Sequence, residues 1–496
     1  MAEPQIGQLY EFSGKVSFND KFRCHQIQFA HYRTILPTDA EGIFSYLVDV
    51  ARWVGPSIAQ AIVKEFGSAT LEIIKQTPEK VQAMNVKGLT AARLDEMRKS
   101  LIDNEALEAA TVEVNNLLSG AVGPATVRKA IKKWGCNAAT LIRQNPYMLT
   151  ALPGIGFLSA DAVHRKLDGD PQAIARHRAA LLHVLGEAAA REGHTLISLT
   201  RARLDTGRLV GSLLPAAEDP DNASIIRDDA TESIALSDLA GAEHYIAHKL
   251  TDMIRYTPDV DEIGFPAIDT DGLAGDQAEA VKAFRPASVF ALVGAPGTGK
   301  TYTVARIVKS LRDAGRPVLL AAPTGKAAKQ MTVALSETCG GEARTIHSLL
   351  EPQVDEDSGE FTFTRGEHLP LEAEIVVIDE ASMIDVRLFR SLLKALPARC
   401  RLLIVGDHYQ LPSVGPGAVL RDLLRASLPH VELKEIKRNA GLIVRACHAI
   451  KDGRIPRPAE RLNLETGDNW RHIEVGDPES IKLVIHTLIG KAIPAL

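Results

Sequence analysis

Ser288-Val-Phe-Ala-Leu-Val293 runs directly into Gly294-Ala-Pro-Gly-Thr-Gly-Lys300-Thr301 in this chain of 496 residues. A short apolar run of this kind is typical of a strand that is buried on both faces. A glycine loop that follows such a strand and ends in Lys-Thr is the P-loop pattern, in which backbone N–H groups surround phosphate oxygens. The stretch therefore predicts an α/β fold with a nucleotide site at the end of one strand.

The P-loop pattern assigns roles to individual residues. We expect Lys300 to reach the β- and γ-phosphates of ATP and Thr301 to ligate Mg²⁺. The residues expected to surround the nucleotide are Gly294, Ala295, Pro296, Gly297, Thr298, Gly299, Lys300, Thr301 and Tyr302.

Two further strands are predicted to supply catalytic groups. The first, residues 374–378, ends at Asp379-Glu380. We expect Asp379 to hold the Mg²⁺ shell and Glu380 to polarise the attacking water. The second, residues 401–405, leads into a loop with Gln410. A polar side chain at a strand end beside a P-loop can sense the γ-phosphate, so Gln410 is the candidate sensor, although by itself it would be an ordinary loop glutamine.

The front half contains an internal repeat at an offset of 68 residues: Val54-Gly-Pro56 recurs as Val122-Gly-Pro124. Each copy leads into a glycine turn, at 86–90 in the first copy and at 152–156 in the second. Such a turn between two short helices predicts a helix-hairpin-helix unit, in which glycine lets a phosphate approach the backbone. One such turn alone would favour simple helix packing, whereas two tandem copies favour DNA binding.

Charge separates the two copies. The formal net charge of −5 does not indicate nucleic-acid binding, yet residues 115–160 contain five basic residues and no acid. Four of these basic residues share one predicted helical face, and we weigh phosphate contact by this stripe equally against a merely solvated surface. The first copy carries acids and is expected to be structural. The DNA-contacting residues predicted in the second copy are Arg128, Lys129, Lys132, Lys133, Gly154 and Gly156.

Composition sets broader limits. Hydrophobic residues make up 45% and charged residues 24%, as in globular proteins with buried cores. No apolar run approaches the ~18 residues that span a bilayer, and no signal peptide is evident, so we expect a cytoplasmic protein without a membrane segment. The five cysteines lack metal-ligand spacing and are interpreted as buried thiols in a reducing compartment.

The ordered set of motifs resembles the RecD-like branch of superfamily-one helicases, which translocate five-prime to three-prime on single-stranded DNA. The resemblance implies that Gln277 reads adenine and that Arg438, in Lys434-Glu-Ile-Lys-Arg-Asn439, reaches the γ-phosphate. The family usually has Gln where Asn439 stands. By the same resemblance, the DNA backbone is contacted by Pro323, Thr324, Gly325 and Lys326.

The resemblance covers nearly the whole chain and extends to a β-hairpin. Residues 360–364, Glu-Phe-Thr-Phe-Thr, lie where the family inserts the pin that splits the duplex. Phe361 and Phe363 are candidates for this role, although packing within the hairpin is the more plain interpretation for at least one of them.

The expected organisation has five parts. We predict a small β unit (1–40), a tandem helix-hairpin-helix region (41–190), a small winged-helix-like or packing domain (191–265), a first RecA-like core with a pin near 351–373 (266–430), and the start of a second RecA-like core (431–496). Only 58 residues follow Arg438, whereas a compact domain of this kind takes roughly 100–150. We therefore expect the second core to be incomplete, with a C-terminal fragment as a possible partner.

The expected function is an ATP- and Mg²⁺-dependent DNA helicase in repair or recombination, acting on single-stranded DNA and on duplexes with a five-prime overhang. Because the family's later motifs are missing, we expect the chain alone to bind ATP and DNA without unwinding a duplex. The alternative is an adaptor that binds DNA under nucleotide control and does not translocate.

Overall fold

The computed structural model describes residues 9–19, 23–35, 37–219, 223–255, 259–260, 264–336, 338, 340–354, 361–435, 442–459, 470 and 473–492. The chain forms two compact units. The described parts of the first lie within Met1–Val184 and Arg203–Asp219, and those of the second within Leu185–Ala202, Pro220–Val354 and Phe361–Leu496.

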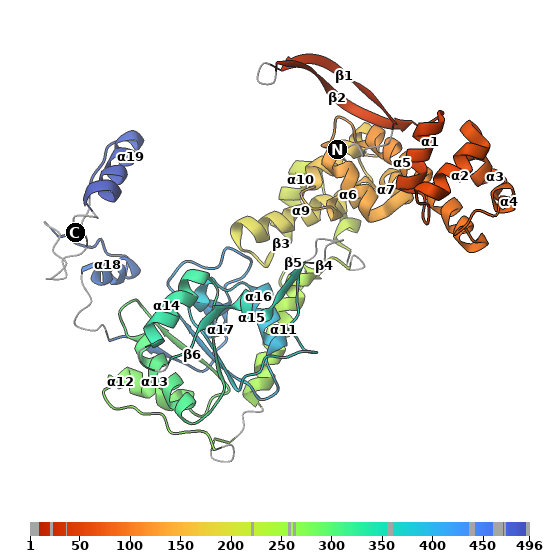
Figure 1. Ribbon diagram of the computed structural model, residues 1–496. Coiled ribbons are helices and arrows are strands. Elements are labelled where there is room, and N and C mark those ends of the chain that lie inside the picture. Colours follow the sequence, from red (N-terminus) through yellow and green to blue (C-terminus); the bar gives the residue numbers. More distant parts are fainter. Residues whose placement is uncertain are drawn as a thin grey trace. The chain divides into compact units, whose positions relative to one another are not determined.

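The first unit begins with a β-hairpin and continues as helices (Figure 1). Strands β1 (Leu9–Asn19) and β2 (Cys24–Ile35) pair antiparallel, and α1 (Ala40–Val50) follows. The repeated helices come in matched order. In the first copy they are α2 (Pro56–Phe66), η1 (Gly67–Ala69), α3 (Thr70–Gln76), α4 (Pro78–Ala83) and α5 (Ala91–Leu118). In the second copy they are α6 (Pro124–Trp134), η2 (Gly135–Asn137), α7 (Ala138–Gln144), η3 (Pro146–Ala151) and α8 (Phe157–Lys166).

The repeat predicted from the sequence is confirmed in the backbone. Pro56 and Pro124 open equivalent helices, where a missing N–H costs nothing. Gly67 and Gly135 end these helices with φ angles of 53° and 55°, which side-chain-bearing residues adopt rarely. Each copy encloses its own hydrophobic core, because the matched apolar positions in the two copies are buried in separate clusters.

A small antiparallel sheet follows the repeat. Its strands are β3 (Leu196–Ser198), β4 (Ile225–Asp228) and β5 (Ser233–Leu236), in the order β3-β5-β4. The helical elements around it in sequence are α9 (Ile174–Glu192), α10 (Leu199–Val210), η4 (Pro215–Glu218) and α11 (Ser237–Arg255).

Helix α11 contacts the small sheet and also packs against the nucleotide core. Its apolar residues Leu239, Ala242, Ile246 and Leu250 are buried in the same hydrophobic cluster as the sheet of the nucleotide core. Their spacing forms one helical stripe that needs an apolar partner, and the sheet supplies it. The expectation of a small winged-helix-like or packing domain over 191–265 stays a prediction, and we propose that α11 belongs with the nucleotide core.

The nucleotide core is a six-stranded, wholly parallel sheet in the order β13-β6-β12-β11-β7-β8. Its strands are β6 (Val289–Gly294), β7 (Val318–Ala322), β8 (Ala343–Thr345), β11 (Ile375–Ile378), β12 (Arg401–Gly406) and β13 (His430–Leu433). Alternate side chains of β6 enter opposite clusters, with Phe290 and Leu292 on one face and Ala291 and Val293 on the other. Both faces are covered, as the continuous apolar run predicted.

Helices cover the two faces of this sheet (Figure 1). One face packs against α12 (Gly275–Phe284), α13 (Lys300–Asp313) and α14 (Gly325–Ser336). The other packs against α11, α15 (Ile346–Leu350), α16 (Val386–Ala395) and α17 (Val419–Arg425). The α/β P-loop fold preceded by a mainly helical region is therefore confirmed.

The hairpin expected near 351–373 is present as β9 (Pro352–Val354) paired with β10 (Phe361–Phe363). Beyond Leu433 the described residues form α18 (Leu442–Lys451), α19 (Pro478–Thr487) and a π-helix (Leu488–Ala492), without a strand. Among the described residues, no helix has the length and apolarity that crossing a membrane requires.

The interpretation of the cysteines as buried thiols is wrong for three of them. Cys24, Cys136 and Cys447 are exposed, whereas Cys400 is buried and burial raises the pKa of its thiol to about 12. Cys339 lies outside the described residues.

A backbone contact in the second unit joins the small sheet region to the core. Gly417 N donates to Gly193 O at 2.8 Å, in the turn that follows α9. Gly417 has a φ of +92°, and a Cβ there would lie 2.3 Å from Cγ1 of Val386. Only glycine fits this position without displacing the helix that Val386 begins.

We predict that Gly417→Ala destabilises the second unit by about 1–3 kcal/mol, because the added methyl overpacks the contact with Val386. The midpoint of thermal or urea unfolding measures the effect. Gly186→Ala is the matched control: Gly186 lies within α9 with open space around its Cβ position, so alanine should stabilise by roughly 0.5–1 kcal/mol. Equal midpoints for the two variants would contradict the packing described.

Candidate functional site

The P-loop joins the end of β6 to the start of α13. Gly297 and Gly299 adopt φ angles of 81° and 86°, which the loop needs in order to turn. A Cβ at Gly294 would lie 2.8 Å from Oγ1 of Thr298 and 2.9 Å from the carbonyl oxygen of Leu433. The loop is thus as tight as the sequence pattern requires.

Lys300 lies folded into this loop. Its Nζ donates to Gly294 O at 2.6 Å and to Ala295 O at 3.3 Å. Burial lowers the pKa of Lys300, while the nearby carboxylates of Asp407, Asp379 and Glu380 act in the opposite direction. The ammonium therefore faces three acids in a partly desolvated site, where its charge interacts more strongly than in water.

Asp379 and Glu380 follow β11 directly. Asp379 N donates to Ala321 O at 2.9 Å, and Glu380 N donates to Oδ1 of Asp379 at 2.8 Å. Burial raises the pKa of both carboxyl groups. The carboxylates of Asp379 and Asp407 raise the pKa of Glu380 further, whereas Lys300 lowers the pKa of both groups. Glu380 has a φ of +52°, a conformation that costs roughly 1–3 kcal/mol and is typical of functional sites.

Asp407 is a site residue that the sequence reasoning missed. Its side chain is 3% exposed, its Oδ1 accepts from Tyr409 N at 3.0 Å, and it is the first carboxylate acting on Lys300. The available signal was its place at the carboxyl end of a buried strand, next to the strand that carries the P-loop.

Gln410 is exposed, and its backbone N–H donates to Asp407 O at 3.1 Å. The loop therefore places Gln410 one turn beyond the carboxylate that faces Lys300. The role of Gln410 as a γ-phosphate sensor stays a prediction. Arg438, the other expected γ-phosphate contact, lies outside the described residues.

Gln277 is buried in the first turn of α12. Its Oε1 accepts from Ala274 N at 3.1 Å, and its Nε2 donates to the P-loop carbonyl of Thr298 at 3.1 Å. The side chain therefore connects α12 to the P-loop. The adenine contact expected of Gln277 stays a prediction.

Thr301 and Tyr302 lie exposed at the start of α13. The guanidinium of Arg306 lies 5.7 Å from the centre of the Tyr302 ring, and one of its nitrogens donates to the Tyr302 hydroxyl at 3.4 Å. An exposed aromatic ring beside the loop is compatible with the expected nucleotide contact.

The residues present fit Mg²⁺. Thr301 offers an exposed hydroxyl and Asp379 a half-buried carboxylate, and oxygen ligands are those that Mg²⁺ prefers. Among the described residues, no group of three or more His, Cys, Asp or Glu side chains is arranged to hold a metal ion. A site with so few protein ligands suits an ion that keeps water and shares the phosphates of its substrate.

The four residues expected at the DNA backbone lie between β7 and α14. Thr324 Oγ1 accepts from Ala327 N at 3.2 Å and so caps α14, while Gly325 and Lys326 are exposed and Pro323 is half-buried. An exposed cation at the start of a helix is compatible with phosphate contact, which stays a prediction here.

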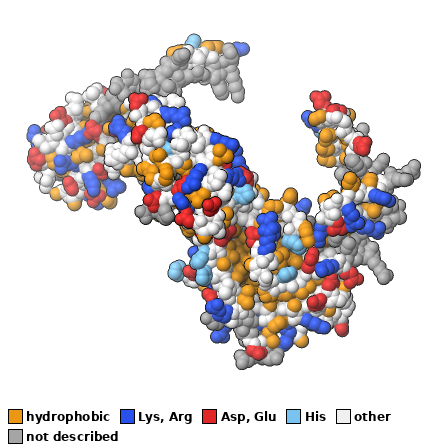
Figure 2. Space-filling model, turned by 180° about the vertical axis from the view of Figure 1, so that it is seen from behind, with side chains coloured by type: hydrophobic (Ala, Val, Ile, Leu, Met, Phe, Trp, Pro, Cys, Tyr) orange, Lys and Arg blue, Asp and Glu red, His pale blue; other side chains and the backbone are white. Residues whose placement is uncertain are grey.

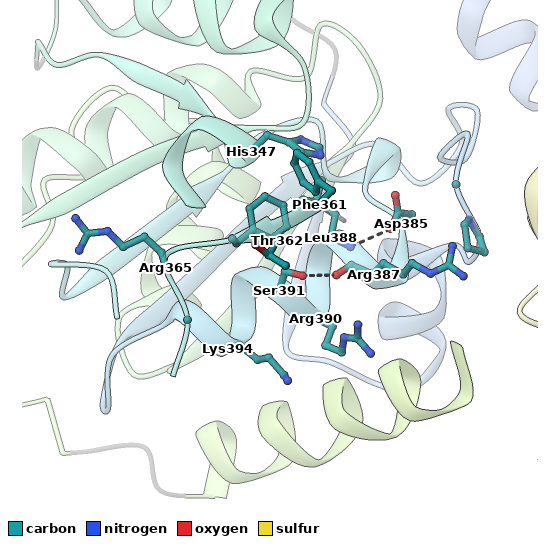
Figure 3. A pocket seen from close by; sticks show the side chains of 14 residues that line it. His347, Phe361, Thr362, Arg365, Asp385, Arg387, Leu388, Arg390, Ser391 and Lys394 are labelled. Atoms are coloured by element: carbon teal, nitrogen blue, oxygen red, sulfur yellow. Dashed lines mark hydrogen bonds between the residues drawn. The ribbon is translucent and has the colours of Figure 1, made fainter. Parts of the chain in front are cut away.

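A groove of about 650 Å³ lies between the β9–β10 hairpin and α16 (Figure 3). Phe361 is 54% exposed on its wall, whereas Phe363 packs against the core, which confirms the packing interpretation for one of the two rings. Basic side chains of α16 line the groove but have partners on α11: Arg387 pairs with Asp238 at 2.7 Å, and the Lys394 ammonium lies 5.3 Å from the Tyr245 ring centre.

In the second helix-hairpin-helix copy, two of the four basic residues hold the turn itself. Lys129 Nζ donates to Pro153 O at 2.6 Å, and Lys133 Nζ donates to Ala151 O at 3.0 Å. Gly154 has a φ of 81°, and Gly156 directly precedes α8. Basic and acidic side chains are intermingled on the face seen in Figure 2, so the local contacts of α6 matter more than net charge.

The fold and the site define a P-loop NTPase with tandem helix-hairpin-helix units in front of it. Two family models match: the "AAA domain" over residues 272–470, and the "ATP-dependent RecD2 DNA helicase HHH domain" over residues 108–196. The second range contains the whole second copy of the repeat.

Relatives extend the match along the chain. The ATP-dependent RecD2 DNA helicase of Deinococcus radiodurans is 30% identical over 486 residues, which cover 90% of this chain and 65% of that protein. The RecBCD enzyme subunit RecD of Mycolicibacterium smegmatis is 37% identical over 199 residues, 36% of this chain and 35% of the relative. The ATP-dependent DNA helicase dda of Enterobacteria phage T4 is 33% identical over 168 residues, 32% of this chain and 37% of the relative. The resemblance to RecD-like superfamily-one helicases is confirmed, and the chain spans less than two thirds of each of these relatives.

We predict that ATP turnover falls as the pH drops through the pKa of Glu380, which lies above the pKa of an exposed glutamate. Burial raises the pKa of Glu380, so this carboxylate takes up its proton, and ceases to accept one from water, at a higher pH than an exposed glutamate does. Asp379 is raised likewise, and the pair sets the apparent value together. A pH profile of turnover at saturating ATP measures it. Glu380→Gln should bind nucleotide without turnover, and an acid limb in the range of exposed glutamates would contradict the assignment.

We predict that the basic residues of α6 contact DNA and that Lys129 and Lys133 also stabilise the turn. Replacing Arg128 and Lys132 by alanine should weaken DNA binding and reduce the log–log salt slope by about 0.7–0.9 per lost phosphate contact. Replacing Lys129 and Lys133 by alanine should also lower the unfolding midpoint of the first unit, because the turn loses two hydrogen-bond donors. An unchanged salt slope for Arg128→Ala/Lys132→Ala would make this face a solvated surface only.

Proposed function

We propose that this chain is the ATP-hydrolysing and DNA-binding part of a DNA helicase that moves five-prime to three-prime along single-stranded DNA. The observation that carries the proposal is Lys300, folded into a complete P-loop and facing Asp379, Glu380 and Asp407. Carboxylates opposite the P-loop lysine can hold Mg²⁺ and activate water, which hydrolysis requires and nucleotide binding alone does not. This favours a motor over an adaptor that only binds nucleotide.

The geometry suggests how hydrolysis proceeds. The P-loop N–H groups and Lys300 bind the β- and γ-phosphates, and the ammonium exchanges its contact with Gly294 O for phosphate oxygens. Thr301 and Asp379 would hold Mg²⁺, which would neutralise charge that develops on the phosphates. Glu380 orients the attacking water and accepts its proton, a task favoured by its raised pKa. Gln410 and Arg438 are proposed to contact the γ-phosphate.

The DNA substrate is proposed from two exposed surfaces. Lys326 and the first turn of α14 would contact the strand near the nucleotide core, and the Gly154–Gly156 turn with Arg128 and Lys132 would bind phosphates in the first unit. The half-exposed ring of Phe361 on the β9–β10 hairpin offers a surface on which a base can stack at the point of strand separation. A duplex with a five-prime overhang is thus the proposed substrate, and DNA repair or recombination in the cytoplasm the proposed setting.

We predict that the chain releases phosphate from ATP and that single-stranded DNA accelerates this release. Lys300→Ala should abolish turnover with an unchanged unfolding midpoint, because the variant lacks the ammonium that binds the β- and γ-phosphates. Strand separation is measured in parallel on duplexes with a five-prime tail, a three-prime tail or no tail. Preference for the three-prime tail would overturn the proposed direction, and DNA-independent turnover that survives Lys300→Ala would overturn the site assignment.

A further inference from the structure

The first turn of α12 contacts two parts of the core that are far apart in sequence. Gln277 reaches the P-loop at Thr298, as described above. Its neighbour Asp276 points instead to the chain that leaves β13: Oδ2 accepts from Lys434 N at 2.9 Å and from Glu435 N at 3.1 Å. Adjacent residues of one helical turn therefore connect the nucleotide loop with the segment after the last strand of the sheet.

The end of β13 itself lies next to the P-loop. Leu433, the last residue of β13, is paired with Gly294, the first residue of the loop. The Leu433 carbonyl oxygen lies 2.9 Å from where a Cβ on Gly294 would be. Lys300 also donates to the carbonyl of Gly294. A change in the contacts of Lys300 therefore acts on a residue in direct contact with the end of β13.

Asp276 is not a simple helix cap. Ala274 is the N-cap of α12, and the Gln277 side chain already accepts from its backbone N–H. Among the described residues, Oδ1 of Asp276 is buried without a hydrogen-bond partner. A buried carboxylate oxygen without a partner disfavours this arrangement, so its presence calls for a role in addition to fold stability.

We propose that Asp276 is a positioning residue that couples the nucleotide state of the P-loop to the backbone of Lys434 and Glu435, directly after β13. The proposal rests on the proposed ATPase function and extends it to a residue that does not touch substrate. Nucleotide draws Lys300 from Gly294 O, α12 responds through Gln277, and Asp276 transmits the shift to the N–H groups of Lys434 and Glu435.

The test measures hydrogen exchange of the Lys434 and Glu435 amides in the full chain, with and without Mg²⁺ and ATPγS. In the wild-type chain, nucleotide should change the exchange rate of both amides. Asp276→Ala should raise their rate about tenfold in the absence of nucleotide, the order expected for losing a hydrogen bond to a charged group, and should remove the nucleotide response. Asp276→Asn keeps an acceptor oxygen and should restore most of the protection and of the response.

Two controls separate coupling from folding and from nucleotide binding. Glu279→Ala, on an exposed position of the same helix, should leave both amides as in the wild type. The affinity of Asp276→Ala for ATPγS should stay within about twofold of wild type, because the phosphate-binding groups are untouched. Nucleotide binding without any change at Lys434 and Glu435 in the wild-type chain would overturn the coupling alone. Absence of nucleotide binding by the wild-type chain would overturn the proposed function, and the coupling with it.

Discussion

The missing side chain at Gly294 is the constraint on which the nucleotide core depends. Three elements meet there: the P-loop returns through Thr298, β13 ends beside it at Leu433, and Lys300 donates to its carbonyl. A methyl group would meet Oγ1 of Thr298 and the backbone of Leu433 at less than van der Waals distance. The sheet register, the shape of the loop and the resting position of the lysine all follow from this close approach.

Partial burial gives the charges around Lys300 their effect. The ammonium and the three carboxylates influence one another because the strand ends and the loop exclude much of the water between them. Burial lowers the pKa of the lysine and raises that of Glu380, so both groups lie nearer to neutrality than their exposed counterparts. Such perturbation is common where a protein handles charged phosphates, and uncommon in a structural ion pair at a surface.

The sequence was most informative where a local pattern has one physical solution. The glycine loop between strand and helix, the acidic end of β11 and the repeat with its proline and glycine boundaries were predictable, because each depends on neighbouring residues. The place of Asp407 at the end of a buried strand was visible in the sequence, but its proximity to Lys300 depends on which strands are neighbours across more than a hundred residues. The carbonyl contacts of Lys129 and Lys133 depend in the same way on how a turn folds back over α6. The apolar spacing of α11 does not say which surface the helix covers, because that depends on the rest of the fold.

The two copies of the repeat share a backbone but not a charge pattern. At the offset of 68 residues, Ala61 stands for Lys129 and Glu65 for Lys133, while helices α2 and α6 begin and end at matching positions. The scaffold thus tolerates opposite surface chemistry without a change of shape, which is the behaviour expected after an internal duplication whose halves diverged under different selection. The first copy can therefore serve as an internal control for the second. Each basic residue of α6 can be introduced at the matching position of α2, one at a time, to measure what it contributes.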